Sequence, residues 1–330
     1  MKKRILISDI ARDLGISVTT VSFILNDKSK EKRISEALTK KVLSHIKKVG
    51  YKPNQLAKSL RTGQTKMLGL LVEDIGNTFF ANMAKLIEKS AYNHGYHISY
   101  CSTDNDETKT KELIQLFYDR QVDGFILTPS EGLEETVQKL INNNIPLVLI
   151  DRYLTEVDTS YVVSDNFKGA YDATKHLLAD QGKSKKVGFI SLYSNQTQMR
   201  DRLDGYMKAI DDHKNQAYIK KINMDEEDEE AVSLIHDFLL EHKLDAVLFA
   251  TNYLAILGLK TIKKYNLKYP EIFSFDDHTL FSLHEPPISV VSQDIHALSA
   301  ETISCLIKEI GNKNKQSNKV VVPCALKIRA

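Results

Sequence analysis

Several acidic, amide and guanidinium side chains stand at the ends of short apolar runs, where they could bind a small polar molecule. Asp151 and Arg152 follow PLVLI, Asn252 follows AVLFAT, and Asp276 lies in FSFDD. An aspartate can accept hydrogen bonds from two adjacent hydroxyl groups, and the guanidinium fork donates to oxygen atoms. If the runs are parallel strands, their carboxyl ends gather these side chains where open α/β sheets bind ligands. The pattern predicts a site for a polyhydroxylated ligand; structural ion pairs at strand ends are the alternative.

The sequence lacks the compact motifs that would indicate an enzyme or a cofactor site. It has no GxGxxG, P-loop, GxSxG or HExxH. The ten histidines include no pair with clear metal-ligand spacing, and Cys101, Cys305 and Cys324 form no CxxC pair. We therefore expect no catalytic residue, no metal site and no cofactor, and we expect the cysteines to be core residues.

The first quarter of the chain contains a candidate for binding DNA. Ile7–Asn26, ISDIARDLGISVTTVSFILN, has the pattern of two short helices joined by a tight turn at Gly15. Ser8 is placed to cap the first helix and Ser17 the second, because a serine hydroxyl accepts a hydrogen bond from a first-turn N–H. This is the pattern of a helix-turn-helix, whose second helix enters the major groove. An ordinary helical hairpin is the alternative.

The residues that follow make the pattern specific. A third helix is predicted from Ser35 to Val49, with Gly50 as its stop, and YKPNQLAKSLRTGQT follows it. The order TVSxxLN, third helix, Gly-Tyr-x-Pro-Asn-x-x-Ala-x-x-Leu resembles the lactose-repressor (LacI/GalR) family of bacterial transcription regulators. The resemblance implies an all-α DNA-binding head with a hinge helix at about 53–61, followed by a two-lobed periplasmic-binding-protein-like α/β body.

The resemblance also implies which side chains of the head meet DNA. They are Ser8, Ser17, Thr19, Thr20, Ser22, Phe23, Asn26, Tyr51, Asn54, Ala57 and Leu60. Phe23 stands where relatives often carry arginine, and it cannot make the bidentate bond of arginine to guanine. We therefore expect it to make apolar contact, for instance with a thymine methyl group. Leu60 is expected to insert into the minor groove at the operator centre.

For the body, the resemblance implies a set of effector-binding residues. An aspartate and an aromatic pair face the cleft in relatives, and Arg202 lies in RDRLDGY, similar to the family's Arg-x-x-Gly-aromatic element. The candidates are Asp74, Phe79, Phe80, Asp151, Arg152, Gln198, Arg202, Asn252 and Asp276. Two features depart from the family. Tyr253 stands where relatives usually have an acid, and the 270–277 stretch is shorter than usual, so its strand is expected to enter the cleft differently.

Charge divides the chain in the same way. Residues 1–65 carry 15 Lys and Arg against five acids, whereas the other 265 residues carry 30 basic and 38 acidic side chains. A basic head on an acidic body suits a head that meets phosphates. The apolar run Ile5–Ile7 is too short for a signal peptide, and no segment approaches membrane-spanning length, so we expect a cytoplasmic protein.

After the head, apolar runs of strand length alternate with stretches of helical period, which predicts parallel sheets covered on both faces. The runs are 67–72, 97–101, 124–128, 146–150, 161–163, 186–192, 246–251, 288–291 and 319–328. Because about 265 residues is long for one sheet, we expect two α/β lobes. The head is placed at 1–65 and the body at 66–330. The first lobe takes about 66–163 and 293–321, and the second about 164–292 and 322–330.

These features predict a homodimeric transcription regulator whose binding to a pseudo-palindromic operator is controlled by a small effector, which we expect to be a carbohydrate. The alternatives are a regulator controlled mainly by a protein partner and a sugar-processing α/β enzyme. The chain ends directly after KVVVPCALKIRA, which favours a dimer over a tetramer.

Overall fold

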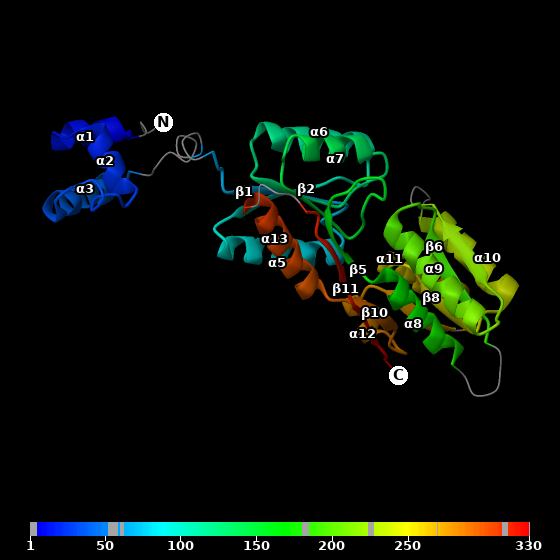
Figure 1. The fold of residues 1–330 in the computed structure, drawn as a ribbon. Helices are drawn as coiled ribbons and strands as arrows, with labels where there is room; N and C mark the ends of the chain where they lie inside the picture. The colour runs from blue at the N-terminus through cyan, green and yellow to red at the C-terminus, as the bar shows by residue number, and fades with distance from the viewer. Residues whose placement is uncertain are drawn as a thin grey trace. The chain divides into compact units, whose positions relative to one another are not determined.

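The computed structural model describes residues 5–51, 59, 63–179, 185–223, 228–268, 270–311 and 316–329. The chain forms two compact units, Met1–Thr65 and Lys66–Ala330. Figure 1 shows their helices and strands, and each unit is described by itself.

The first unit is a small helical domain made of α1 (Ile7–Leu14), α2 (Val18–Leu25) and α3 (Glu36–Val49). Its core is an apolar cluster in which Ile10, Val21 and Val42, one from each helix, have no exposed surface. α1 and α3 end at Gly15 and Gly50, both with positive φ, which glycine adopts without the clash of a Cβ atom. The predicted helix-turn-helix and third helix are therefore present.

Two predictions for this unit need comment. Ser8 does not cap α1, because the helix begins one residue earlier and Leu6 is its N-cap. The carboxylate of Asp9 accepts a hydrogen bond from the Leu6 N–H at 3.0 Å instead. The hinge-helix candidates Asn54, Ala57 and Leu60 lie outside the described residues.

The second unit contains two six-stranded sheets. The first has the order β11-β5-β4-β3-β1-β2, and all its pairs are parallel. Its strands are β1 (Met67–Val72), β2 (His97–Ser102), β3 (Gly124–Leu127), β4 (Leu147–Ile150), β5 (Ser160–Ser164) and β11 (Lys319–Val322). Its helices are α5 (Thr78–Asn93), α6 (Glu107–Asp119), α7 (Glu134–Asn142) and α13 (Ile295–Gly311).

Both faces of this sheet are buried, as the alternation along β1 shows. Leu68 and Leu70 belong to the apolar cluster shared with α5 and α13, and Leu71 belongs to the cluster shared with α6 and α7. Successive residues of a strand point to opposite faces, so helices must cover both.

The second sheet has the order β12-β10-β9-β8-β6-β7 and is parallel except for the pair β10–β12. Its strands are β6 (Val187–Leu192), β7 (Tyr218–Ile222), β8 (Ala246–Phe249), β9 (Glu271–Phe275), β10 (Ser289–Gln293) and β12 (Cys324–Lys327). The helices of this lobe are α8 (Asn166–Leu178), α9 (Thr197–Asp212), α10 (Asp228–His242), α11 (Asn252–Tyr265) and α12 (Thr279–Leu283). The predicted α/β class with two lobes is confirmed.

The chain passes between the two lobes three times. It does so between β5 and α8, between β10 and α13, and at Pro323 between β11 and β12.

Strand β7 and helix α12 were not predicted from the sequence. β7 is the edge strand YIKKI, in which only Tyr218 and Ile222 are buried, so it lacks the continuous apolar run of its neighbours. α12 has only five residues, too few to show a helical period. Among the described residues, no helix is long and apolar enough to cross a membrane.

Candidate functional site

The outward face of α2 is the candidate DNA-reading surface of the head. Thr19 and Asn26 are exposed, and Thr20, Ser22 and Phe23 are half-buried. No lysine or arginine occurs between Val18 and Leu25. The helix therefore offers hydroxyl, amide and apolar groups to a groove, whereas the basic residues of the head lie outside it.

Several of the predicted DNA-binding residues have clear structural duties as well. Ser17 caps α2, since its Oγ accepts from the Thr20 N–H at 3.0 Å. Asn26 ends α2 and donates from Nδ2 to the Ser22 carbonyl at 2.7 Å. Tyr51 packs against the head's apolar cluster. Ser8 is exposed on α1.

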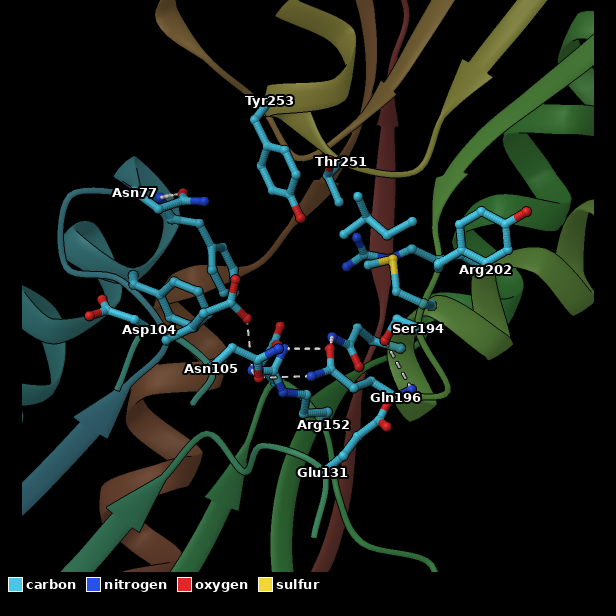
Figure 2. Close-up of a pocket in the computed structure, with 18 of the residues that line it drawn as sticks. Asn77, Asp104, Asn105, Glu131, Arg152, Ser194, Gln196, Arg202, Thr251 and Tyr253 are labelled. Atoms are coloured by element: carbon cyan, nitrogen blue, oxygen red, sulfur yellow. Dashed lines mark hydrogen bonds and ion pairs between the residues drawn. The ribbon is translucent and has the colours of Figure 1, made fainter. Parts of the chain in front are cut away.

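The body has a cavity of about 720 Å³ between its two lobes (Figure 2). Its walls are loops that follow the carboxyl ends of strands from both sheets, the place where parallel sheets bind ligands. Seven of the predicted effector-binding residues line it: Phe79, Phe80, Asp151, Arg152, Gln198, Arg202 and Asp276.

The remaining two predicted residues, Asp74 and Asn252, do not line this cavity. Both line an adjoining hollow of about 460 Å³. Asp74 turns back on its own loop, where its Oδ1 accepts from the Gly76 N–H at 2.7 Å. Asn252 is the first residue of α11 and is 4% exposed.

Five charged residues of the lining, Glu73, Asp151, Arg152, Arg202 and Asp276, are called here the inner wall of the cavity. Within it, Arg202 is held by several protein contacts. Its Nε donates to Asn166 Oδ1 at 2.9 Å, and its Nη1 donates to the Ala250 carbonyl at 2.6 Å. The guanidinium carbon lies 3.7 Å from the centre of the Phe275 ring, and Nη1 is 3.8 Å from Asp276 Oδ2. No hydrogen bond among the described residues uses Nη2, so this nitrogen remains for a ligand.

The Arg-x-x-Gly-aromatic element explains how α9 presents Arg202. A Cβ atom on Gly205 would lie 2.2 Å from the Phe167 carbonyl of α8, so glycine allows the two helices to approach closely. The next residue, Tyr206, is fully buried, and its hydroxyl donates to the Val187 carbonyl at 2.8 Å. The element therefore fixes α9 to both α8 and β6.

Arg152 lines the cavity, and all three of its donor nitrogens already contact protein groups. Its Nε donates to the Pro129 carbonyl at 2.8 Å, its Nη1 to Gln196 Oε1 at 2.9 Å, and its Nη2 lies 2.7 Å from Glu73 Oε2. Gln196 belongs to the other lobe and also donates to Asn105 Oδ1 at 2.9 Å (Figure 2). Arg152 thus joins the lobes and keeps little capacity for a ligand.

Asp151 and Asp276 are the acceptors at the inner wall. Both residues end a strand with positive φ, at 67° and 69°. Gln293 Nε2 donates to Asp276 Oδ1 at 2.5 Å. Burial raises the pKa of Asp276, an effect that the charge of Arg202 opposes. Burial raises the pKa of Asp151 to about 6, although Arg152 and Arg202 stabilise its charge.

Several residues that line the cavity were not among the predicted effector-binding residues, notably Glu73, Asn105, Gln196, Thr251 and Tyr253. Of these, only Tyr253 was noted from the sequence, as a departure from the family. The hydroxyl of Tyr253 points into the cavity (Figure 2), and burial raises its pKa. Most of these residues lie just beyond the ends of strands β1, β2, β6 and β8. Applying the strand-end rule to every predicted strand would have found them.

The cavity lining is predominantly acidic. Arg152 and Arg202 are its basic side chains among the described residues, against seven carboxylates: Glu73, Asp104, Asp106, Glu107, Glu131, Asp151 and Asp276. No three histidine, cysteine or acidic side chains in the described part of the chain converge on a metal ion. The arrangement suits reversible binding of a polar molecule.

Two family models match the chain. Residues 6–54 match the model for bacterial regulatory proteins of the lacI family, and residues 68–316 match the periplasmic binding protein domain. The two matches cover the helical unit and most of the two-sheet unit.

Individual proteins are similar over nearly the whole chain. The ribose operon repressor of Halalkalibacterium halodurans is 31% identical over 327 residues, covering 98% of this chain and 96% of that protein. The HTH-type transcriptional regulator RegA of Clostridium saccharobutylicum is 32% identical over 318 residues, covering 93% of each. The crystal structure of the lac repressor dimer bound to operator and the anti-inducer ONPF has a TM-score of 0.85 at 18% identity, covering 99% of this chain and 98% of that chain.

Proposed function

This chain belongs to the LacI family of bacterial transcription regulators, and from that premise we propose that a sugar or sugar derivative, bound in the cavity of the body, controls its binding to operator DNA. It is a DNA-binding regulator under small-molecule control, and its relatives are transcription regulators rather than enzymes. The identity of the ligand class and the residues that bind it are the proposal.

The observation that carries the proposal is the pairing of Arg202 and Asp276 on one wall of a cavity lined by both lobes. Arg202 has a free donor nitrogen and Asp276 is a buried acceptor. Because a hydroxyl group both donates and accepts hydrogen bonds, this pair suits a ligand with adjacent hydroxyl groups. A ligand that binds between the two lobes can shift the populations of two lobe arrangements only if it binds one arrangement more tightly than the other. Resemblance to a ribose operon repressor supports a carbohydrate.

A ligand panel tests the proposal. The full-length protein would be titrated with pentoses, hexoses, and their amino and phosphate derivatives, and its melting temperature followed. A ligand at one hundred times its Kd stabilises the folded state by about 2.7 kcal/mol, a shift that is easily measured. The same ligand should change operator affinity in a DNA-binding titration. If no member of the panel raises the melting temperature, the proposal fails and control by a protein partner becomes the better explanation.

Specificity for the operator is proposed to depend on Phe23. Its ring is half-buried, with Lys32 Nζ 5.5 Å from the ring centroid, so an edge remains for the groove. We expect Phe23→Ala to weaken binding to the preferred operator by about 1–3 kcal/mol and to leave non-specific binding and its salt dependence unchanged. Leu43→Ala, which removes an exposed apolar side chain from α3, is the control. Equal weakening on all DNA sequences would contradict this role.

We also propose that the protein is a homodimer in the cytoplasm, where its DNA target lies. A two-fold symmetric operator requires two heads, and a dimer supplies them with matching symmetry. Light scattering of the full-length protein at micromolar concentration should give twice the 37.4 kDa mass of the chain. A stable monomer or a stable tetramer would be the contrary result.

A further inference from the structure

The charges at the inner wall of the cavity do not balance. Glu73 is 2.7 Å from Arg152, and Asp276 is 3.8 Å from Arg202 and also accepts from Gln293. Arg152 also lies 3.7 Å from Asp151, so three carboxylates share two guanidinium groups at this wall. Asp151 is the one of the three that accepts no hydrogen bond from the described residues and has no ion pair shorter than 3.7 Å.

The surroundings of Asp151 are unusual for a buried carboxylate. Its side chain is only 9% exposed, yet no hydrogen-bond donor in the described part of the chain reaches it. Its nearest cation, Arg152 Nη1, is 3.7 Å away and donates to Gln196 instead. A buried carboxylate that accepts no hydrogen bond is costly, so one that lines a cavity in this state stands to gain from a donor that arrives with the ligand.

We propose that the effector carries a protonated amino group that donates hydrogen bonds to Asp151, which makes it an amino sugar or another amine-bearing polyol. The inference rests on the proposed function, since it names the charge class of the ligand for the same cavity. Arg202 Nη2 and Asp276 would hold the hydroxyl groups, and Asp151 would hold the ammonium group.

The remaining lining residues favour the same class. Two of the seven lining carboxylates, Asp104 and Glu107, are ion-paired with Lys109 and Lys111. A phosphate or carboxylate ligand would therefore meet five carboxylates and two arginines, of which Arg152 has little donor capacity left. Like charges at short range repel, and they act most strongly where water is excluded. Since Lys109 and Lys111 are already paired with carboxylates, we assign the missing positive charge to the ligand.

The ionisation of Asp151 supplies a second signature. Arg152 and Arg202 lower its pKa, whereas burial, Glu73 and Asp276 raise it, and the balance leaves it at about 6. A cationic ligand binds the ionised form, so its affinity should fall about tenfold between pH near 7 and pH near 5, as that form is lost. A neutral sugar interacts less strongly with the charge of Asp151, so its affinity should depend less on pH.

The test uses matched triplets on the full-length protein. Glucosamine, galactosamine and mannosamine are each compared with the parent hexose and its phosphate monoester by calorimetric titration near pH 7. We expect one amino sugar to bind at least tenfold more tightly than both of its partners. Tighter binding of a neutral or phosphorylated member would overturn the inference but leave the proposed function intact. Absence of binding by every member would also overturn the inference, whereas the proposed function fails only if the wider panel described above shows no binding.

Two variants test whether Asp151 is the residue responsible for the preference for an amino group. Asp151→Asn keeps the size and tolerates the positive φ, and it should abolish both the amine preference and the pH dependence. Asp158→Asn, which neutralises an exposed carboxylate away from the cavity, should retain both. An amine preference that survives Asp151→Asn would overturn the assignment.

Discussion

Replacement of Arg202 by alanine is expected to lower the free energy of unfolding of the ligand-free body by about 3–5 kcal/mol. The side chain is 2% exposed and joins three elements, since it donates to Asn166 of α8 and to Ala250 after β8, and lies on Phe275 of β9. Its loss would also leave Asp276 buried without its nearest positive charge. Urea unfolding of the full-length protein, followed by circular dichroism, measures the loss.

The chain offers a close control for this prediction. Arg200 lies on the same helix but is exposed, so Arg200→Ala should change stability by no more than about 0.5 kcal/mol. If the unpaired charge of Asp276 contributes to the loss, adding Asp276→Asn to Arg202→Ala should restore part of it. An Arg202→Ala protein that unfolds like the parent would show that the hydrogen bonds of Arg202 are not important for folding.

This expectation changes how sensing can be studied. The sequence predicts that Arg202 donates hydrogen bonds to the ligand, because it lies in an element that resembles the family's Arg-x-x-Gly-aromatic element. The structure adds that two of its three nitrogens are already engaged by the protein. Arg202→Ala therefore alters both binding and folding. Asp276→Asn is the better probe of effector binding, because asparagine keeps the positive φ and the Oδ1 acceptor used by Gln293.

The parts of the fold that were predicted depend on local patterns. The core positions of the head repeat every three or four residues, and β1, β3, β4, β6 and β8 are continuous apolar runs. Edge strand β7 was not predicted because it lacks the continuous apolar run that is typical of the central strands. The N-cap of α1 was predicted at Ser8, two residues after the observed N-cap Leu6, because Ser8 and Asp9 both have oxygen atoms that could accept from N–H groups at the start of the helix.

The candidate site was harder to predict than the fold. Asp151 and Arg152 are adjacent in sequence and read as a pair, yet Arg152 makes its shortest ion pair with Glu73, almost eighty residues earlier. Which carboxylate a guanidinium chooses depends on the three-dimensional arrangement of strand ends, and sequence adjacency does not reveal it. That Asp151 is left with the longer contact to Arg152 is therefore visible only in the structure.

Asp151→Asn is expected to stabilise the ligand-free protein at alkaline pH. A carboxyl group whose pKa is raised from 3.8 to about 6 in the folded state opposes folding once it ionises. Its favourable contribution is fully present below pH 4 and is lost as the pH rises through 6. Near pH 8 the shift corresponds to a penalty on the order of 3 kcal/mol, which the neutral amide removes. Urea unfolding of parent and variant should therefore differ most near pH 8 and converge near pH 4.

Asp158→Asn should show no gain at either pH, because Lys319 lowers the pKa of Asp158 instead. A variant less stable than the parent at pH 8 would mean that the Asp151 carboxylate has a stabilising partner in the folded protein, and the case for an ammonium ligand would fall with it.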